Sequence, residues 1–337
     1  MTTLKTISSI FIITFFVACG SDAGKEETGT STTTQPTDPL IVDTTPALKK
    51  KPSTYAEAYN RALLLWGIPY TEKDIPTTFG AAHVIIAGPQ NGEPLVLLHG
   101  MNASSTMWYP NVKDFTKQYR IYAIDFLMEP GKSVYNGGID NTDQVISWYN
   151  EIFDQLKLTK FSIVGISRGG WLALNITLHD QSRIHKLALL SPAQTFTWIK
   201  PNAEVVTNIT YTVNPKREKL RTALETMMYD VDILKQDYID QYYIATQEAT
   251  LSKMIAQMTP FSEKELESVS VPVLVLIGDT DIINGEKSLK RAKKHIPGVE
   301  TDEIKHAGHF LTFDQPEVVD KKVLDFLNEK KDLSAKK

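Results

Sequence analysis

From Tyr55 onward the chain alternates between continuous apolar runs of strand length and segments with helical periodicity. Leu95–Leu98 and Val273–Ile277 are apolar at successive positions, as in parallel strands that helices cover on both faces. Asp143–Leu158 instead spaces its apolar residues three and four apart, which indicates a helix with one buried face. This alternation predicts an α/β fold with a mostly parallel central sheet and helices on both faces.

The same patterns place the individual elements. Strands are expected at His83–Ala87, Leu95–His99, Tyr122–Phe126, Ser162–Gly165, Lys186–Leu190, Val273–Ile277 and Glu300–Lys305. Residues 193–270 carry no strong strand signal, and Glu218–Met228 and Ile233–Ile244 within them have helical character. We therefore expect residues 193–270 to form a helical cap insertion, and residues 55–192 and 271–330 to form the core. Ligands of open α/β sheets bind at the carboxyl edge of the sheet, where such a cap would lie.

Residues 1–18 have the character of an export signal. One lysine precedes the apolar stretch Ile7–Ala18, which is shorter than the roughly 20 residues that a membrane-spanning helix needs. Cys19 follows this stretch directly. A small residue before a cysteine, here Ala18, resembles the lipobox of bacterial lipoproteins. Phe16 stands where a leucine is usual in that motif. We predict a lipoprotein signal peptide and an exported protein, lipid-anchored to a bacterial membrane through Cys19. An ordinary signal peptide that ends at a cysteine is the alternative.

Residues 19–54 are rich in Thr, Ser, Pro and Gly and have no apolar period. Such a segment cannot bury enough apolar surface to offset the entropy lost on ordering it. We interpret it as a flexible tether between the membrane and the folded domain.

Charge and cysteine content exclude several classes of protein. Lys and Arg together number 36 and Asp and Glu 40, so the formal net charge is −4. A weakly acidic chain without a basic block has no electrostatic footprint for nucleic acid. Cys19 is the one cysteine, so an intrachain disulfide and a zinc site built on cysteines are both excluded. The composition does not indicate an oligomeric state.

The strongest motif surrounds Ser167. Gly165 and Gly169 flank it in a Gly-x-Ser-x-Gly pattern, which follows the apolar run Phe161–Val164 and opens the helical stretch Trp171–His179. In a strand–turn–helix context this pattern is a nucleophile elbow. Side chains at the two glycines would collide with the neighbouring strand and helix. Ser167 would then project at the sheet edge, at a helix N-terminus that favours negative charge.

A serine nucleophile in acyl transfer needs two preorganised donors for the oxyanion. One is the backbone N–H of the residue after the nucleophile, here Arg168. The other comes from the loop after an early strand, here Met101 in the sequence Leu-His-Gly-Met-Asn. Both act through the backbone, and we interpret His99 as a structural residue that braces this loop.

The nucleophile also needs a base and an acid that orients the base. Asp279 and Asp281 follow one predicted strand, and His306 and His309 follow the last one, so the order along the chain is Ser, Asp, His, as in α/β hydrolases. His309 is favoured as the base, because the small residues before it let the loop carry its imidazole toward Ser167. His306 remains tied to the strand end.

Two other patterns do not hold up. Gly131-Lys132-Ser133 lacks the earlier glycine of a phosphate-binding loop, because position 126 is phenylalanine. His306 and His309 lie three apart, but no His-Glu-x-x-His motif stands near them. We therefore expect no metal and no cofactor.

Residues 78–327 resemble the α/β-hydrolase superfamily, and in particular bacterial carboxylesterases of the naproxen-esterase type. The matching stretches are Phe79–Gly80, His83–Ile86, Pro94–Gly100, Ser104–Asn111, Leu190–Ala193 and Ala307–His309. The resemblance implies a triad of Ser167, Asp281 and His309 and ester hydrolysis without a cofactor. Arg168 departs from the smaller or apolar residue that is common at its place.

These features predict a serine hydrolase that cleaves a carboxylic ester of a small molecule through an acyl-enzyme. An aminopeptidase or a carbon–carbon hydrolase on the same fold would use the same triad. A module that binds or senses a ligand without catalysis is the alternative from another class.

Overall fold

The computed structural model describes residues 54–249 and 257–329 of the 337-residue chain. The predicted signal peptide, Cys19 and nearly all of the predicted tether lie outside the described residues, so these assignments stay predictions. No helix among the described residues is long and apolar enough to cross a membrane.

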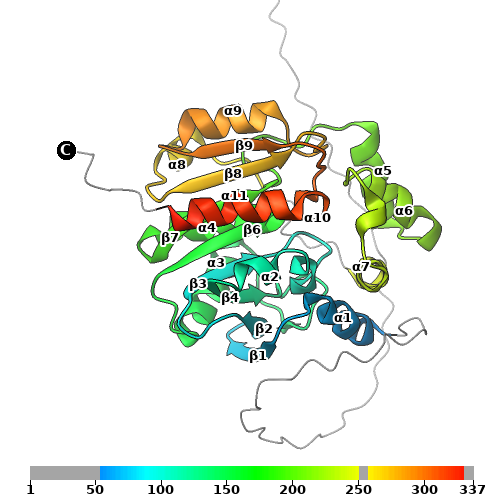
Figure 1. Cartoon of the computed structure of the whole chain (residues 1–337), viewed down its shortest axis with the longest axis horizontal. Helices are drawn as coiled ribbons and strands as arrows, with labels where there is room; N and C mark the ends of the chain where they lie inside the picture. Colours follow the sequence, from blue (N-terminus) through cyan, green and yellow to red (C-terminus); the bar gives the residue numbers. More distant parts are fainter. Residues whose placement is uncertain (1–53, 250–256, 330–337) are drawn as a thin grey trace, which may run out of the picture. The chain divides into compact units, whose positions relative to one another are not determined.

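A nine-stranded sheet forms the centre of the described part of the chain (Figure 1). The strands are β1 Tyr70–Thr77, β2 Gly80–Ala87, β3 Glu93–Leu98, β4 Tyr119–Ile124, β5 Val134–Tyr135, β6 Phe161–Ile166, β7 Ile184–Leu190, β8 Val273–Gly278 and β9 Glu300–Ile304. Their order is β1-β2-β4-β3-β6-β7-β8-β9, and β5 pairs with β2. The strands from β4 to β9 along this order are parallel, whereas the pairs that β2 makes are antiparallel. The predicted α/β-hydrolase fold with a mostly parallel sheet is confirmed.

Helices pack on both faces of this sheet (Figure 1). The α-helices of the described residues are α1 Tyr55–Leu63, α2 Val112–Phe115, α3 Thr142–Gln155, α4 Arg168–His179, α5 Ala203–Val213, α6 Arg217–Glu225, α7 Gln236–Glu248, α8 Glu263–Glu267, α9 Glu286–His295, α10 Leu311–Asp314 and α11 Pro316–Asn328. The packing of β3 shows why Leu95–Leu98 are all apolar. Leu95 and Leu97 join the core cluster that contains α11, while Val96 and Leu98 join the cluster that contains α3 and α4. Successive side chains of a strand point to opposite faces, so both faces require apolar residues.

Every strand expected from the sequence is present, and the structure adds β1 and β5, which the sequence analysis missed. β1 has the sequence YTEKDIPT and pairs with β2 alone, at one end of the strand order. In it Ile75 is buried, and the other residues are exposed or half-buried. An edge strand of this kind carries no apolar run, so periodicity could not detect it.

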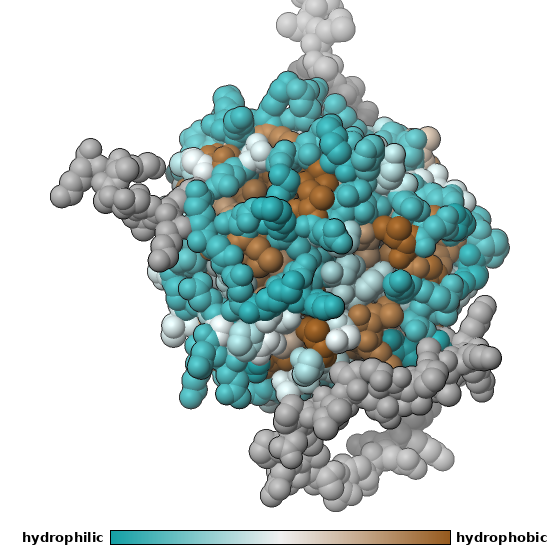
Figure 2. Space-filling view, in the orientation of Figure 1, coloured by the Kyte–Doolittle hydropathy of each residue, from teal (hydrophilic) through white to brown (hydrophobic). Residues whose placement is uncertain are grey.

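Helices α5, α6 and α7 lie between β7 and β8 in the chain, within the segment predicted to form a cap. Helix α7 contacts α1, where Asp237 pairs with Arg61. Helix α5 exposes Val206, Ile209 and Val213 by 54%, 58% and 63%. Figure 2 shows apolar side chains gathered on the surface over α5 and α6. Helix α8 belongs to the same predicted segment but packs close to α9 of the core. The domain boundaries themselves stay a prediction.

Candidate active site

Ser167 occupies a sharp turn between β6 and α4. Its φ of 53° and ψ of −120° are rare for a residue other than glycine, so the turn stores strain. The Ser167 N–H donates to Leu190 O at 2.9 Å, which ties the turn to β7. A Cβ atom at Gly165 would lie 2.3 Å from Gly169 O, and one at Gly169 would lie 2.2 Å from Leu98 O. Only glycine fits at both positions, as the elbow interpretation required.

His309 and Asp281 meet Ser167 at the carboxyl edge of the sheet, from loops after β9 and β8. His309 Nε2 lies 2.8 Å from Ser167 Oγ. His309 Nδ1 lies 2.9 Å from Asp281 Oδ1. An ionised carboxylate can only accept, so Nδ1 carries the proton and Nε2 is free to accept from the serine hydroxyl. The three side chains form one continuous hydrogen-bonded line, and all three residues are buried.

The surroundings of Asp281 favour its charged form. Burial alone would raise the pKa of its carboxyl, but the nearby His309 and several hydrogen bonds hold that pKa below its usual value. Oδ1 accepts from the N–H groups of Ile283 at 2.8 Å and Asn284 at 3.2 Å. Oδ2 accepts from the Asn284 side chain at 3.0 Å. Asp281 is therefore an ionised acceptor suited to orient an imidazole.

The alternative residues lie elsewhere. His306 is exposed, and its ring packs edge-on against Tyr229 with 5.1 Å between the ring centres. Asp279 Oδ1 accepts the N–H of Ala307 at 3.1 Å, which braces the turn after β9. Among the predicted candidates, the structure brings His309 and Asp281 to Ser167 and leaves His306 and Asp279 outside the hydrogen-bonded line.

The loop that carries His309 is tied to the segment after α6. Gly308 N donates to Asp314 Oδ2 at 2.8 Å. The same carboxylate accepts from the N–H groups of Tyr229 at 3.0 Å and Asp230 at 3.1 Å. Phe310 N donates to Met227 O at 3.1 Å. The segment after α6 therefore helps to place His309, and Asp314 links that segment to the His309 loop. The sequence analysis did not predict this role for Asp314.

The two backbone segments that carry the predicted oxyanion donors lie beside Ser167. Arg168 is the first residue of α4, and the first N–H groups of a helix have no acceptor within the helix. Met101 lies in the turn after β3, and a Cβ atom at the preceding Gly100 would be 3.4 Å from Ser167 Cβ. The two backbone segments thus flank the nucleophile.

His99 braces the loop after β3, which carries Met101, as the sequence analysis predicted. Its Nε2 accepts the N–H of Phe126 at 2.8 Å, and its Nδ1 lies 2.8 Å from Gly100 O. Burial, with a smaller contribution from Arg168, lowers the pKa of His99 to about 4. The imidazole is neutral at pH 7, which matches one nitrogen that accepts and one that donates.

Helix α7 also contacts this region through Gln241. Its side-chain oxygen accepts from Thr106 Oγ1 at 2.6 Å, and its side-chain nitrogen donates to Ser104 Oγ at 2.8 Å and to Tyr55 Oη at 3.1 Å. All of these groups are buried or nearly so. The network fixes an inserted helix against the loop after β3. A lone glutamine gives no sequence signal for such a role.

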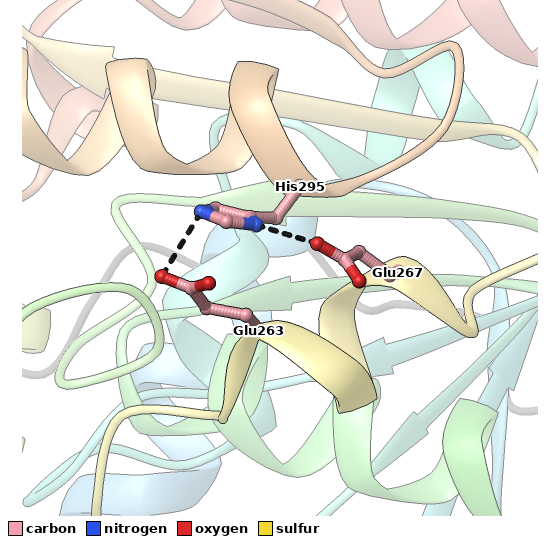
Figure 3. A group of neighbouring side chains, drawn as sticks. All are labelled: Glu263, Glu267 and His295. Atoms are coloured by element: carbon pink, nitrogen blue, oxygen red, sulfur yellow. Dashed lines mark hydrogen bonds and ion pairs between the residues drawn. The ribbon is translucent and has the colours of Figure 1, made fainter.

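One cluster has the composition of a metal site, although the sequence analysis did not consider it. His295 of α9 lies between Glu263 and Glu267 of α8 (Figure 3). Its Nδ1 is 2.9 Å from Glu267 and its Nε2 is 3.4 Å from Glu263. Each carboxylate pairs with a different ring nitrogen, so the imidazole links both glutamates of α8 to α9, and one ligand atom from each residue lies within 4.8 Å of the others. The arrangement suits a bridge between two helices better than a metal centre.

The fold and the elbow together define an α/β hydrolase. A family model described as serine aminopeptidase matches residues 90–316, which is more than half of the chain. The chain belongs to this family.

Within the family the chain is carboxylesterase-like. An uncharacterized carboxylesterase of Bacillus subtilis is 33% identical over 84% of this chain and 95% of its own length. A second carboxylesterase of Bacillus subtilis is 31% identical over 81% of this chain and 93% of its own length. The crystal structure of naproxen esterase from Bacillus subtilis superposes with a TM-score of 0.77 at 32% identity, covering 84% of this chain and all of that one.

Proposed function

We propose that this protein is a serine carboxylesterase that works through Ser167, His309 and Asp281. The observation that carries the proposal is the unbroken line from Asp281 Oδ1 through His309 to Ser167 Oγ at the strained elbow. An activated serine, an oriented base and two flanking backbone donors are the parts that acyl transfer requires.

The geometry supports the following steps. Ser167 Oγ attacks the ester carbonyl while His309 Nε2 takes its proton, and Asp281 stabilises the imidazolium that results. The N–H groups of Met101 and Arg168 bind the oxyanion. The C–O bond to the alcohol then breaks, and His309 passes its proton to the departing alkoxide. Water, activated by the same imidazole, cleaves the acyl-enzyme to release the acid and restore Ser167.

Ester substrates are favoured over amides by the names of the two similar Bacillus subtilis proteins. The matching family model is described as serine aminopeptidase, and the same triad would also serve an aminopeptidase. A panel of p-nitrophenyl esters of graded acyl length, matched by the corresponding p-nitroanilides, separates the two. We expect ester turnover with kcat/KM well above that for any anilide.

A fluorophosphonate probe tests the nucleophile in the same samples. We expect the wild-type protein to be labelled at Ser167 and the Ser167→Ala variant to remain unlabelled. Labelling without turnover of any ester would instead support a binding or sensing module. Faster turnover of anilides than of esters would support an aminopeptidase.

We also propose that the enzyme is exported and lipid-anchored through Cys19, on the strength of the apolar stretch that ends there. Several acyl chains anchor a protein stably, whereas one chain binds only marginally. Replacing Cys19→Ala should move the protein from the membrane fraction to the soluble fraction or block its processing. A wild-type protein that is soluble and begins at another residue would refute the proposal.

A further inference from the structure

A buried ion pair lies beside the elbow and takes no part in the steps above. Arg168 follows Ser167 directly, and its Nη1 donates to Glu129 Oε1. The two side chains are only 4% and 5% exposed. Two charges taken out of water need well-made hydrogen bonds to offset their lost hydration. Glu129 comes from the loop after β4, so this pair joins a separate loop to the residue that supplies one oxyanion donor.

The second oxygen of Glu129 reaches the segment that supplies the other donor. Glu129 Oε2 accepts the N–H of Asn102 at 2.7 Å. Asn102 comes directly after Met101 and has a φ of 57°, in the left-handed region that few residues other than glycine adopt. A charge-assisted hydrogen bond therefore holds the turn after β3 in an uncommon conformation.

Two further contacts stiffen the same groups. The Arg168 guanidinium lies 4.6 Å from the centre of the Phe126 ring. The Phe126 N–H in turn donates to His99, whose other ring nitrogen contacts Gly100 O. The loops after β3 and β4 and the start of α4 are thus joined around the nucleophile by side chains.

We propose that Glu129 is a positioning residue that sets the separation of the two oxyanion donors. Its carboxylate holds the Arg168 side chain with one oxygen and the Asn102 N–H with the other. We name these three groups the Glu129 clamp. The inference rests on the proposed function, because an oxyanion forms only if Ser167 attacks a carbonyl.

The clamp acts on the transition state rather than on substrate binding. The donors strengthen their hydrogen bonds as negative charge develops, so an error in their placement is felt most in the transition state. Loss of a whole oxyanion donor typically costs 10²–10³ in kcat. A displaced donor should cost less than a missing one.

The test is Glu129→Gln, which keeps the size of the side chain and removes its charge. With a p-nitrophenyl ester that the wild type hydrolyses, we expect kcat to fall about 10- to 100-fold while KM stays within about twofold. Affinity for a trifluoromethyl ketone, which forms a charged adduct with the serine, should fall by a similar factor. A role in overall stability alone would not move kcat and inhibitor affinity together.

Two controls isolate the clamp. Val323→Ala removes a fully buried group in α11 and should lower Tm without lowering kcat. The double variant Glu129→Gln with Arg168→Met should lose no more kcat than Glu129→Gln alone, because the clamp is already open in the single variant. If Glu129→Gln does not fold, Arg168→Lys is compared with Arg168→Met. Lysine keeps the charge, so it should retain at least about tenfold more kcat.

The outcomes separate the two proposals. A wild type that turns over no ester would refute the proposed function, and the catalytic role of the clamp with it. An active wild type whose Glu129→Gln variant has the same kcat, or loses only KM, would overturn the clamp alone. Equal kcat in Arg168→Lys and Arg168→Met would also overturn it.

Discussion

Two buried aspartates of this chain lie in contrasting surroundings. Asp281 lies in the loop after β8, and Asp320 lies within helix α11. Asp281 Oδ1 and Oδ2 together accept from Ile283, from Asn284 and from His309. Asp320 Oδ1 accepts from Asn111 at 2.8 Å, and its Oδ2 has no hydrogen-bond partner among the described residues. The pKa of Asp281 lies below its usual value, whereas burial, only partly offset by Asn111, raises that of Asp320 to about 8.

Burial acts in the same direction on both carboxyls, so the difference arises from the donors around them. A loop leaves backbone N–H groups free to turn toward a side chain, as those of Ile283 and Asn284 do. Within a helix those groups already bond to the backbone, so Asp320 has only side chains to rely on. The same residue type is therefore an ionised orienting group in one place and a neutral packing group in the other.

The largest effect on kcat is expected at Ser167, the last residue of the hydrogen-bonded line that begins at Asp281. Ser167→Ala should lower kcat by about 10⁶, as loss of the nucleophile does in a comparable triad. Ser162→Ala, in the buried interior of β6, is the matched control and should retain activity. Purified Ser167→Ala with more than a few per cent of wild-type turnover would remove Ser167 from the nucleophile role.

Asp281→Asn should lower kcat by about 10⁴, because an amide stabilises the wrong imidazole tautomer. The matched variant is Asp279→Asn, two residues away. Asp279 accepts a backbone N–H of the His309 loop, so its loss should lower Tm more than kcat. Steady-state kinetics and thermal unfolding of both variants decide the assignment. If Asp279→Asn, still folded, loses more kcat than Asp281→Asn, the acid has been misassigned.

The parts of this site that the sequence predicted are those that lie within five residues of the end of a strand. Ser167, Asp281 and His309 each follow a strand whose apolar run was recognisable, and parallel strands bring their carboxyl ends to one edge. Short-range patterns placed Ser167 and His309 and narrowed the acid to two aspartates, of which the family resemblance implied Asp281. The structure finds the three residues in hydrogen-bond contact.

The supporting residues could not be found in this way. Glu129, Gln241 and Asp314 act on segments remote in the chain, and nothing in their neighbouring residues specifies those partners. Glu129 did leave one usable signal, since it is an isolated acid in the run Phe-Leu-Met-Glu-Pro after a buried strand. A buried acid needs a partner, and the unexpected arginine at position 168 is that partner.

The smallest effect concerns Asp320 and appears in stability. The folded chain keeps the proton of Asp320 up to about pH 8, whereas an unfolded aspartate loses it near pH 4. Between these values the folded state binds one more proton, so the free energy of unfolding falls as pH rises, by up to about 1.4 kcal/mol per pH unit. Asp320→Asn removes that dependence, and its amide can donate to Asn111 Oδ1, which lacks a donor among the described residues.

Thermal unfolding at several pH values measures this prediction. The Tm of Asp320→Asn should be close to that of the wild type near pH 4, and the difference should widen as pH rises, to roughly 10 °C at pH 8. Asp325→Asn is the control on the same helix, because Asp325 is exposed and pairs with Lys321, so its variant should follow the wild-type pH dependence. If the difference in Tm between Asp320→Asn and the wild type is the same at every pH, Asp320 is ionised in the folded protein. In that case the contrast with Asp281 disappears, and burial without donors is not sufficient to keep a carboxyl neutral in this fold.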